Sequence, residues 1–237
     1  MTDAPSPREF FNRRASEYHG GAPGPMAPFH RRIARQIEHS LDGEVLAVGG
    51  LWAQADLGRT RCEITVSDVS DAMLEHWSGN GLRTVRCDAR ELEFGDASFG
   101  AVVLPLVLHH IAGAHGLQAR REVARVLGEA FRVLRPGGGV WISEFCVSRA
   151  VYALELAASP LTARLLRAAR VPLVVMHTAT FYLAELERAG FHAAEARRIE
   201  APEAHPLDAI RPVIGLPWLR VPRFTYPVHP TLITARR

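Results

Sequence analysis

The sequence predicts an α/β fold in which a mostly parallel sheet carries helices on both faces, that is, a doubly wound sheet. Three observations lead to this prediction. Short aliphatic runs alternate with amphipathic stretches from residue 44 onward. One run, GAVVL at 100–104, is apolar throughout, which is typical of a central parallel strand. A long amphipathic stretch at 116–134 is followed by proline and then glycine, the order in which helices usually end.

Two helices are expected before the alternation begins. Ser6, Pro7 and Glu9 form a capping box with proline in the first turn, which predicts a helix start, and GGAPGP at 20–25 ends that helix. Apolar residues at helical spacing predict a second helix over 26–40. The strands expected from the alternating pattern are 44–48, 63–67, 84–87, 100–104, 140–144, 191–199 and 231–235. The further helices expected are 53–58 as a short helix or turn, 71–78, 116–134, 180–189 and one or two within 147–176.

The composition is that of a soluble globular protein. Its 237 residues are 48% hydrophobic and 22% charged. The net charge of +3 comes from scattered arginines without a dense basic block, so no nucleic-acid partner is expected. Neither a membrane-spanning run nor a signal peptide is recognisable, so we expect a cytoplasmic protein without a membrane partner. Cys62, Cys87 and Cys146 lack metal spacing and are expected to be buried or half-buried thiols, with no metal site.

Four segments are expected to meet where a doubly wound sheet binds its ligands, beyond the carboxyl ends of its strands. Gly49 and Gly50 follow the first strand, Asp68 the second, Asp88 the third, and LVLHH at 106–110 the fourth. Glycines let backbone approach a ligand closely, and an acid about twenty residues further on is placed for ribose hydroxyls. Asp88 can accept a hydrogen bond from an adenine amino group. Each aspartate alone could be an ordinary strand-end carboxylate, but together they favour a nucleoside site.

The same segments resemble the class I S-adenosylmethionine-dependent methyltransferases that act on small molecules, of the UbiE or methyltransferase type 11 kind. The matching stretches are VLAVGG, SDVSDAML, CDARELEFGDASFGAVVLPLVLHHI, EAFRVLRPGGGVWISE and, near the N-terminus, PREFFNRRASEY. The resemblance covers roughly residues 8–145 well. It implies a Rossmann-like doubly wound seven-stranded sheet with an antiparallel last strand, helical N-terminal and lid additions, and S-adenosyl-L-methionine as cofactor.

On the adenosine side, the resemblance implies a role for five residues. Asp68 would hold the ribose, with Val69 and Met73 flanking the adenine. Asp88 and Ala89 would meet the amino edge of the adenine.

On the methionine side, the resemblance implies four further contacts. Gly49 and Gly50 would face the methionine part, and Leu106 would line the side of the sulfonium. Tyr18 would cover the carboxylate.

The glycine-rich turn departs from the family pattern. Ala47 stands where an acid is usual, and Leu51 and Ala53 stand where glycine is usual. Ala47 removes a carboxylate that helps to fix the amino acid part of the cofactor, and Leu51 places a branched side chain where backbone should approach it. Two alternatives stay open. Other groups hold the methionine end, or the protein no longer transfers methyl groups and is a cyclase-like catalyst or a non-catalytic partner protein.

His109 and His110 are the candidate catalytic residues, because a histidine near the methyl acceptor could take its proton close to neutral pH. Alternatively, one packs and the other caps the next turn, and no base is needed because alignment can supply most of the rate. Glu144 is a further candidate, which we interpret as a solvated carboxylate at a strand end. The variable region holds three more histidines among which the sequence does not choose, His177, His205 and His229.

We expect a single methyltransferase-like domain. Its expected parts are an N-terminal helical cap over 1–40, a cofactor-binding core over 41–146, and a substrate and lid region with the closing strands over 147–237. Apolar side chains in 147–176 and 202–230 favour an apolar or aromatic small molecule, or else a lid packed on the core or a dimer contact. The sequence therefore predicts a methyltransferase of a small, largely apolar metabolite, such as one in a biosynthetic pathway, acting as a monomer or homodimer.

Overall fold

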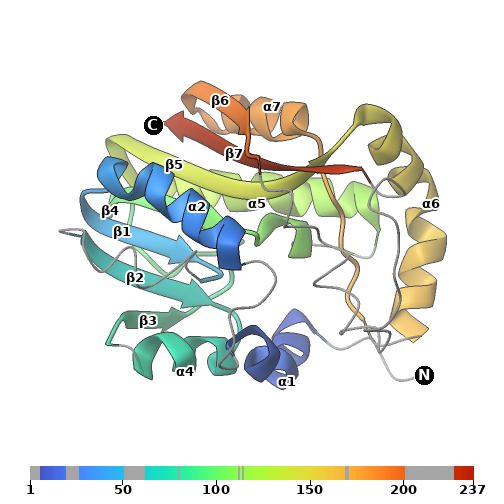
Figure 1. The fold of residues 1–237 in the computed structure, drawn as a ribbon, viewed down its shortest axis with the longest axis horizontal. Coiled ribbons are helices and arrows are strands. Elements are labelled where there is room, and N and C mark those ends of the chain that lie inside the picture. The colour runs from blue at the N-terminus through green and yellow to red at the C-terminus, as the bar shows by residue number, and fades with distance from the viewer. Residues whose placement is uncertain are drawn as a thin grey trace.

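A seven-stranded sheet forms the centre of the computed structural model, which describes residues 6–19, 27–50, 62–79, 81–111, 113, 115–168, 171–200 and 227–237 (Figure 1). Its strands are β1 (Gly43–Val48), β2 (Cys62–Asp68), β3 (Arg83–Arg86), β4 (Phe99–Pro105), β5 (Leu134–Val147), β6 (His192–Arg198) and β7 (Val228–Arg236). They lie in the order β3-β2-β1-β4-β5-β7-β6.

The sheet is doubly wound and mostly parallel, as predicted. Strands β1 to β5 pair in parallel, and β7 lies antiparallel between β5 and β6. The strand order reverses between β1 and β4, which are neighbours although β2 and β3 separate them in the sequence. The carboxyl ends of β1, β2 and β4 therefore meet at one edge, the place where such sheets bind ligands.

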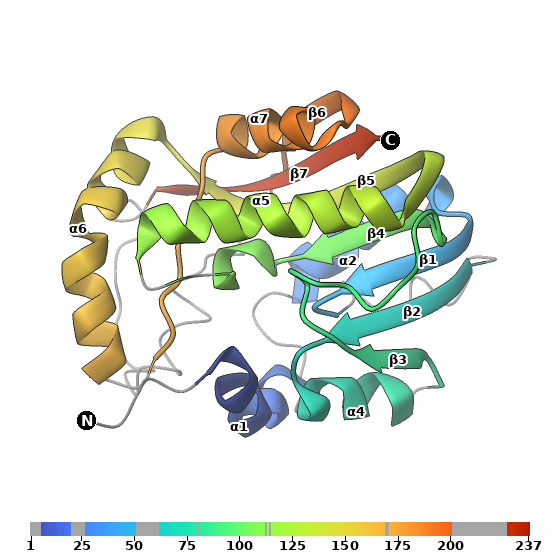
Figure 2. The same cartoon turned by 180° about the vertical axis from the view of Figure 1, so that it is seen from behind.

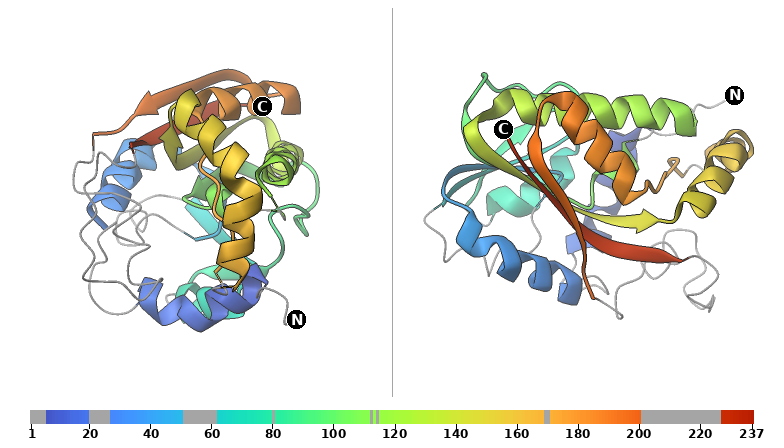
Figure 3. Two further views of the ribbon diagram at one scale, coloured as in Figure 1. Left: turned by 90° about the vertical axis from the view of Figure 1, so that its right-hand side faces the viewer. Right: turned by 90° about the horizontal axis from the view of Figure 1, so that it is seen from above.

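Helices cover both faces of the sheet. They are α1 (Pro7–His19), α2 (Ala27–Ile37), α4 (Asp71–Gly79), α5 (Gly116–Val133), α6 (Arg149–Ala168) and α7 (Ala179–Ala189), with the short 3₁₀ helices η1 (Glu38–Ser40) and η2 (Leu108–His110). Figures 2 and 3 show α5 and α7 on one face of the sheet and α2 on the other. Among the described helices, none is both long enough and apolar enough to cross a membrane.

Two hydrophobic cores, one on each face of the sheet, explain why successive side chains of β1 are apolar. Val45 and Ala47 of β1 face the core that α2 and α4 cover, whereas Leu46 and Val48 face the core under α5 and α7. Successive side chains of a strand point to opposite faces, so an all-apolar strand must be covered on both. Cys87 and Cys146 are buried and Cys62 is half-buried, which confirms the prediction for the thiols.

The predicted elements agree with the observed ones except near one glycine-rich segment. The first four strands match to within one residue at each end, and Ser6 and Glu9 form the capping box of α1, with Glu9 Oε2 accepting from Ser6 N at 2.8 Å. The prediction that Arg135 and the following glycines lie outside the sheet was wrong. They belong to β5, because Leu134 already pairs with Phe99 and Gly137 N donates to Arg237 O. The helix or turn expected at 53–58 lies outside the described residues.

Candidate active site at the carboxyl edge of the sheet

The turn after β1 has the tight backbone that its two glycines predict. Gly49 and Gly50 have φ values of +78° and +118°, a region that residues with side chains rarely adopt. A Cβ atom at Gly49 would lie 2.6 Å from Val107 Cγ2, so the turn passes close to the segment after β4. Ala47 is buried in the core, and Leu51 and Ala53 lie outside the described residues.

Replacing Gly49 with alanine should lower the free energy of unfolding by about 3 kcal/mol. About 1–2 kcal/mol comes from the positive φ, and the rest from the overlap with Val107. Urea unfolding measures the loss. Gly43→Ala is the matched control, because Gly43 also has a positive φ but nothing within 4 Å of the added Cβ. Equal losses in the two variants would contradict the close approach.

Asp68 ends β2 directly before the first turn of α4. Its Oδ1 accepts a hydrogen bond from Ser70 N at 2.8 Å. Burial raises the pKa of Asp68 to about 6, although backbone N–H groups of Ser70 and Val69 oppose the rise. The Ser70 hydroxyl accepts from Met73 N at 3.2 Å and so caps α4. A half-buried carboxylate is therefore held in a fixed place beside a helix N-terminus, with Val69 half-buried and Met73 buried next to it.

The N-terminal helix α1 is fastened to this strand end. Asn12 Oδ1 accepts a hydrogen bond from the Ser70 hydroxyl at 2.6 Å, and Arg8 pairs with Asp71 at 2.5 Å. These contacts join α1 to the start of α4, and the two helices lie side by side in Figures 1 and 2. The backbone of Tyr18 belongs to the last turn of α1, and its side chain lies outside the described part of the chain.

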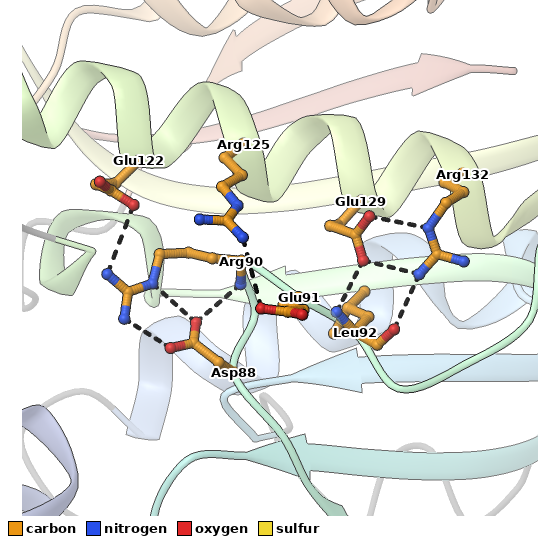
Figure 4. Close-up of polar contacts among 8 residues, drawn as sticks. All are labelled: Asp88, Arg90, Glu91, Leu92, Glu122, Arg125, Glu129 and Arg132. Atoms are coloured by element: carbon orange, nitrogen blue, oxygen red, sulfur yellow. Dashed lines mark hydrogen bonds and ion pairs between the residues drawn. The ribbon is translucent and has the colours of Figure 1, made fainter.

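Asp88, after β3, is held by an arginine that the sequence analysis did not single out. Arg90 donates from Nε to Asp88 Oδ1 at 2.9 Å and from Nη2 to Oδ2 at 2.6 Å, and it also pairs with Glu122 of α5 at 3.5 Å (Figure 4). This pairing lowers the pKa of Asp88. Arg90 N also donates to Oδ1 at 2.9 Å. Since a carboxylate has about four acceptor positions, one position on Oδ2 is left beside half-buried Ala89.

The segment after Asp88 is fixed on α5 by further polar contacts. Leu92 N donates to Glu129 Oε2 at 2.8 Å, and Arg132 Nη2 donates to Leu92 O at 2.9 Å. Arg125 pairs with Glu91 at 3.5 Å (Figure 4). This loop is therefore positioned by a helix about 30 residues further along the chain, which local sequence patterns do not reveal.

Leu106, after β4, has an unusual backbone. Its φ is +54°, and its N–H donates to Ser143 O of β5 at 2.9 Å. For a leucine this conformation costs about 1–2 kcal/mol, and such strain is concentrated at functional sites. The half-buried side chain packs against the core under α2.

His109 and Glu144 form a buried pair, so the interpretation of Glu144 as a solvated carboxylate was wrong. Glu144 is 0% exposed, and its Oε2 lies 2.7 Å from His109 Nδ1. Its Oε1 accepts from Leu108 N at 2.7 Å and from His109 N at 3.4 Å. The 3₁₀ helix η2 turns these donors toward the end of β5, and this turn keeps water away from the carboxylate. A carboxylate facing Nδ1 accepts from that nitrogen, so in the neutral form of the ring the proton lies on Nδ1 and Nε2 has the lone pair.

His110 lies in different surroundings. Its ring makes an edge contact with Phe11 of α1 at 5.0 Å and lies 4.0 Å from the ring of His109. Burial, together with the neighbouring His109, lowers its pKa well below the ordinary value, and Nδ1 has no hydrogen-bond partner within the described residues. Of the two predicted catalytic histidines, His109 therefore has an oriented acidic partner and His110 packs under α1.

The predicted substrate side is only partly in place. Val151 and Tyr152 are half-buried against the core, but three leucines of α6 point outward, Leu154, Leu161 and Leu165 at 70%, 63% and 61% exposed. His177 is buried before α7, His229 is half-buried in β7, and His205 lies outside the described residues. Most of the stretch 202–230 also lies outside them.

Part of the chain matches known proteins in sequence. Residues 46–142 match the family model described as a methyltransferase domain. The chain is 35% identical over 104 residues to the ubiquinone/menaquinone biosynthesis C-methyltransferase UbiE of Desulfotalea psychrophila, and 32% identical over 105 residues to the demethylmenaquinone methyltransferase of Clavibacter sepedonicus. These matches cover 40% and 42% of this chain, and the chain spans 39% of each relative.

Solved structures share the fold over most of the chain. A phosphoethanolamine N-methyltransferase of Haemonchus contortus, in complex with S-adenosylhomocysteine, has a TM-score of 0.65 at 17% identity, over 98% of this chain and 61% of its own. The [4+2]-cyclase SpnF has a TM-score of 0.62 at 19% identity, over 87% of this chain and 80% of its own. At such low identity the likeness shows the fold alone.

Proposed function

We propose that this chain, which carries a methyltransferase domain of the class I S-adenosylmethionine-dependent kind over residues 46–142, transfers a methyl group to a small, largely apolar acceptor. The observation that carries the proposal is the placement of Asp68 and Asp88 at neighbouring strand ends beside the Gly49 turn. Two carboxylates at this edge, with a tight glycine turn at the end of the next strand, β1, suit an adenosine-bearing ligand.

The residues present fit the cofactor that such domains use. Asp68 has a half-buried carboxylate that can accept from ribose hydroxyls, and the free position on Asp88 can accept from an adenine amino group. Gly49 and Gly50, with their positive φ values, form the tight turn that brings backbone to this edge of the sheet, where the methionine part would lie. When bound, S-adenosyl-L-methionine supplies a methyl group already activated on a sulfonium.

His109 is the residue we assign to the acceptor's proton. Glu144 holds Nδ1, so the lone pair of Nε2 is the one available to a hydroxyl or an acidic carbon–hydrogen bond. His110 has no comparable orienting partner among the described residues. Two relatives are named for ubiquinone, menaquinone or demethylmenaquinone chemistry, which supports an apolar acceptor and a biosynthetic role.

Titration calorimetry tests this function directly. S-adenosylmethionine and S-adenosylhomocysteine should both bind, and the demethylated product should bind at least as well as the donor. If millimolar ligand produces no heat and no thermal shift, the proposal is wrong. Ala47, in place of the usual acid, favours a second candidate, a protein that binds the cofactor without transferring its methyl group. Binding without S-adenosylhomocysteine formation across a panel of apolar acceptors would favour that candidate.

Asp88→Ala should weaken S-adenosylhomocysteine binding about tenfold, the cost of one hydrogen bond to a charged group. Arg90→Met should change the dissociation constant by less than about threefold, because Asp88 stays ionised near neutral pH without its partner. Calorimetry on both variants measures the difference. A larger loss in Arg90→Met than in Asp88→Ala would mean that the pair orders the loop and does not contact the ligand.

A further inference from the structure

A second polar cluster, which the proposed function does not use, lies next to the His109–Glu144 pair. We call it the His177 cluster. It comprises Tyr152 of α6, His177 just before α7, and Tyr182 of α7, near the end of β5. His177 Nδ1 lies 3.1 Å from Tyr152 Oη, and the rings of His177 and Tyr182 are 5.6 Å apart.

Backbone hydrogen bonds hold this cluster against the pair. Val175 N, two residues before His177, donates to His109 O at 3.1 Å. Val147 N, three residues after Glu144, donates to His177 O at 3.1 Å. The segment that carries His177 is therefore bonded both to η2 and to the end of β5.

Two polar atoms of the cluster are buried without a hydrogen-bond partner among the described residues. They are Nε2 of His177 and Oη of Tyr182, and both side chains are 0% exposed. Buried polar atoms nearly always have a partner, so two unsatisfied ones in neighbouring rings call for an explanation. A ligand atom or an ordered water has to supply the missing bonds.

The two rings are uncharged near neutral pH. Burial, together with the neighbouring Arg120 and His109, lowers the pKa of His177 to about 3. Burial, with the charge of Glu144, raises the pKa of Tyr182 well above its ordinary value. Groups that stay neutral under burial suit an uncharged partner, because a charged ligand would lose its hydration at this point.

The walls of the cluster are flat. Phe181 stacks on His177 with ring centres 4.3 Å apart, and Tyr182 meets His177 edge-on. The guanidinium group of Arg120 lies over the ring of Phe181, 5.1 Å from its centre. Aromatic neighbours of this kind favour an aromatic ligand whose polar atom meets the ring edges.

We propose that His177 and Tyr182 form a subsite that binds an uncharged oxygen, a hydroxyl or carbonyl, on the ring of the methyl acceptor. Tyr152 sets the orientation of His177 through its hydroxyl. The subsite lies beside His109, so it would orient the acceptor relative to the residue that takes its proton. This inference rests on the proposed function and names the groups that recognise the acceptor.

Phenol, toluene and benzoate test the subsite, because the three share a ring and differ in their polar group. In the wild-type protein with S-adenosylhomocysteine bound, phenol should bind about tenfold more tightly than toluene and should shift the ring-nitrogen resonance of His177. Benzoate should bind no better than toluene. Tighter binding of benzoate than of toluene would indicate an anion bound near Arg120 and would contradict an uncharged ligand. Equal binding of phenol and toluene would contradict the subsite.

Variants separate this role from a structural one. Tyr182→Phe removes one hydroxyl and should abolish the preference for phenol without lowering the melting temperature, because that hydroxyl has no partner to lose. His177→Gln should reduce the preference, whereas His39→Gln, at an exposed histidine, should leave it unchanged. A preference that survives Tyr182→Phe, or a soaked crystal with only water between the two rings, overturns the proposal. Binding of S-adenosylhomocysteine in the same samples tests the proposed function separately.

Discussion

Glu144→Ala is expected to lower the free energy of unfolding by about 3 kcal/mol, because it leaves several buried donors without an acceptor. The carboxylate accepts from Leu108 N, His109 N and the ring of His109, and it is fully buried. Removing it also opens a cavity at the end of β5. Urea unfolding followed by circular dichroism measures the loss, and a change below about 1 kcal/mol would contradict the role of Glu144 as a shared acceptor.

Glu144→Gln is the matched control for this prediction. Its amide oxygen can still accept from Leu108 N, but its NH₂ group can only donate toward His109 Nδ1. The ring should then carry its proton on Nε2, which nitrogen-15 spectra of the imidazole detect. Turnover with an identified acceptor should fall about a hundredfold while S-adenosylhomocysteine binding stays the same. Unchanged turnover would contradict the assignment of His109 as the base and would not affect the stability prediction for Glu144→Ala.

Asp68→Ala is expected to weaken S-adenosylhomocysteine binding about a hundredfold, because the ribose would lose an ionised acceptor. Asp68→Asn keeps an acceptor oxygen and should lose about tenfold. Both dissociation constants can be measured by calorimetry at pH 7. The thermal stability of each variant without ligand serves as the control for misfolding. Binding that is unchanged in Asp68→Ala would remove the ribose contact from the proposed function.

Because the pKa of Asp68 is raised, we expect stability and affinity for the cofactor to change in opposite directions with pH. Its folded pKa of about 6 lies above the ordinary value of 3.8, so the protonated form is favoured by folding. The stability contributed by that proton is complete below the ordinary value and is lost as the pH rises through about 6. Ribose binding should change the other way, because the ionised carboxylate is the better acceptor. Melting temperature and affinity should therefore move oppositely between pH 5 and 7, and Asp68→Asn should flatten both trends.

Much of the fold could be predicted because its signals are local. The all-apolar run at 100–104 in β4 predicted a strand covered on both faces, and both cores contain its side chains. The start of β5 was missed because glycine and proline usually end regular structure. Here Leu134 pairs with Phe99, and Gly137 N and Gly138 O bond to Arg237, a partner at the other end of the sequence.

The positions of the candidate site residues could be predicted from the sequence, but the side-chain pairs that they form could not. Asp68 and Asp88 could be placed because parallel strands end at one edge. The partner of Glu144 lies 35 residues away in a 3₁₀ turn, and Arg90 pairs both with Asp88 and with Glu122 of α5. Such pairings depend on how loops approach one another, which residue types at a given spacing do not specify.

The hydroxyl of Ser70 ties two helices to a single atom. It caps α4 by accepting from Met73 N, and it fastens α1 by donating to Asn12. If α1 moves away from the sheet, the Ser70 hydroxyl loses its hydrogen bond to Asn12. The same hydroxyl caps the first turn of α4, next to Asp68. Opening of the N-terminus and fraying of α4 should thus be one concerted event, visible as matched hydrogen-exchange rates in the two segments.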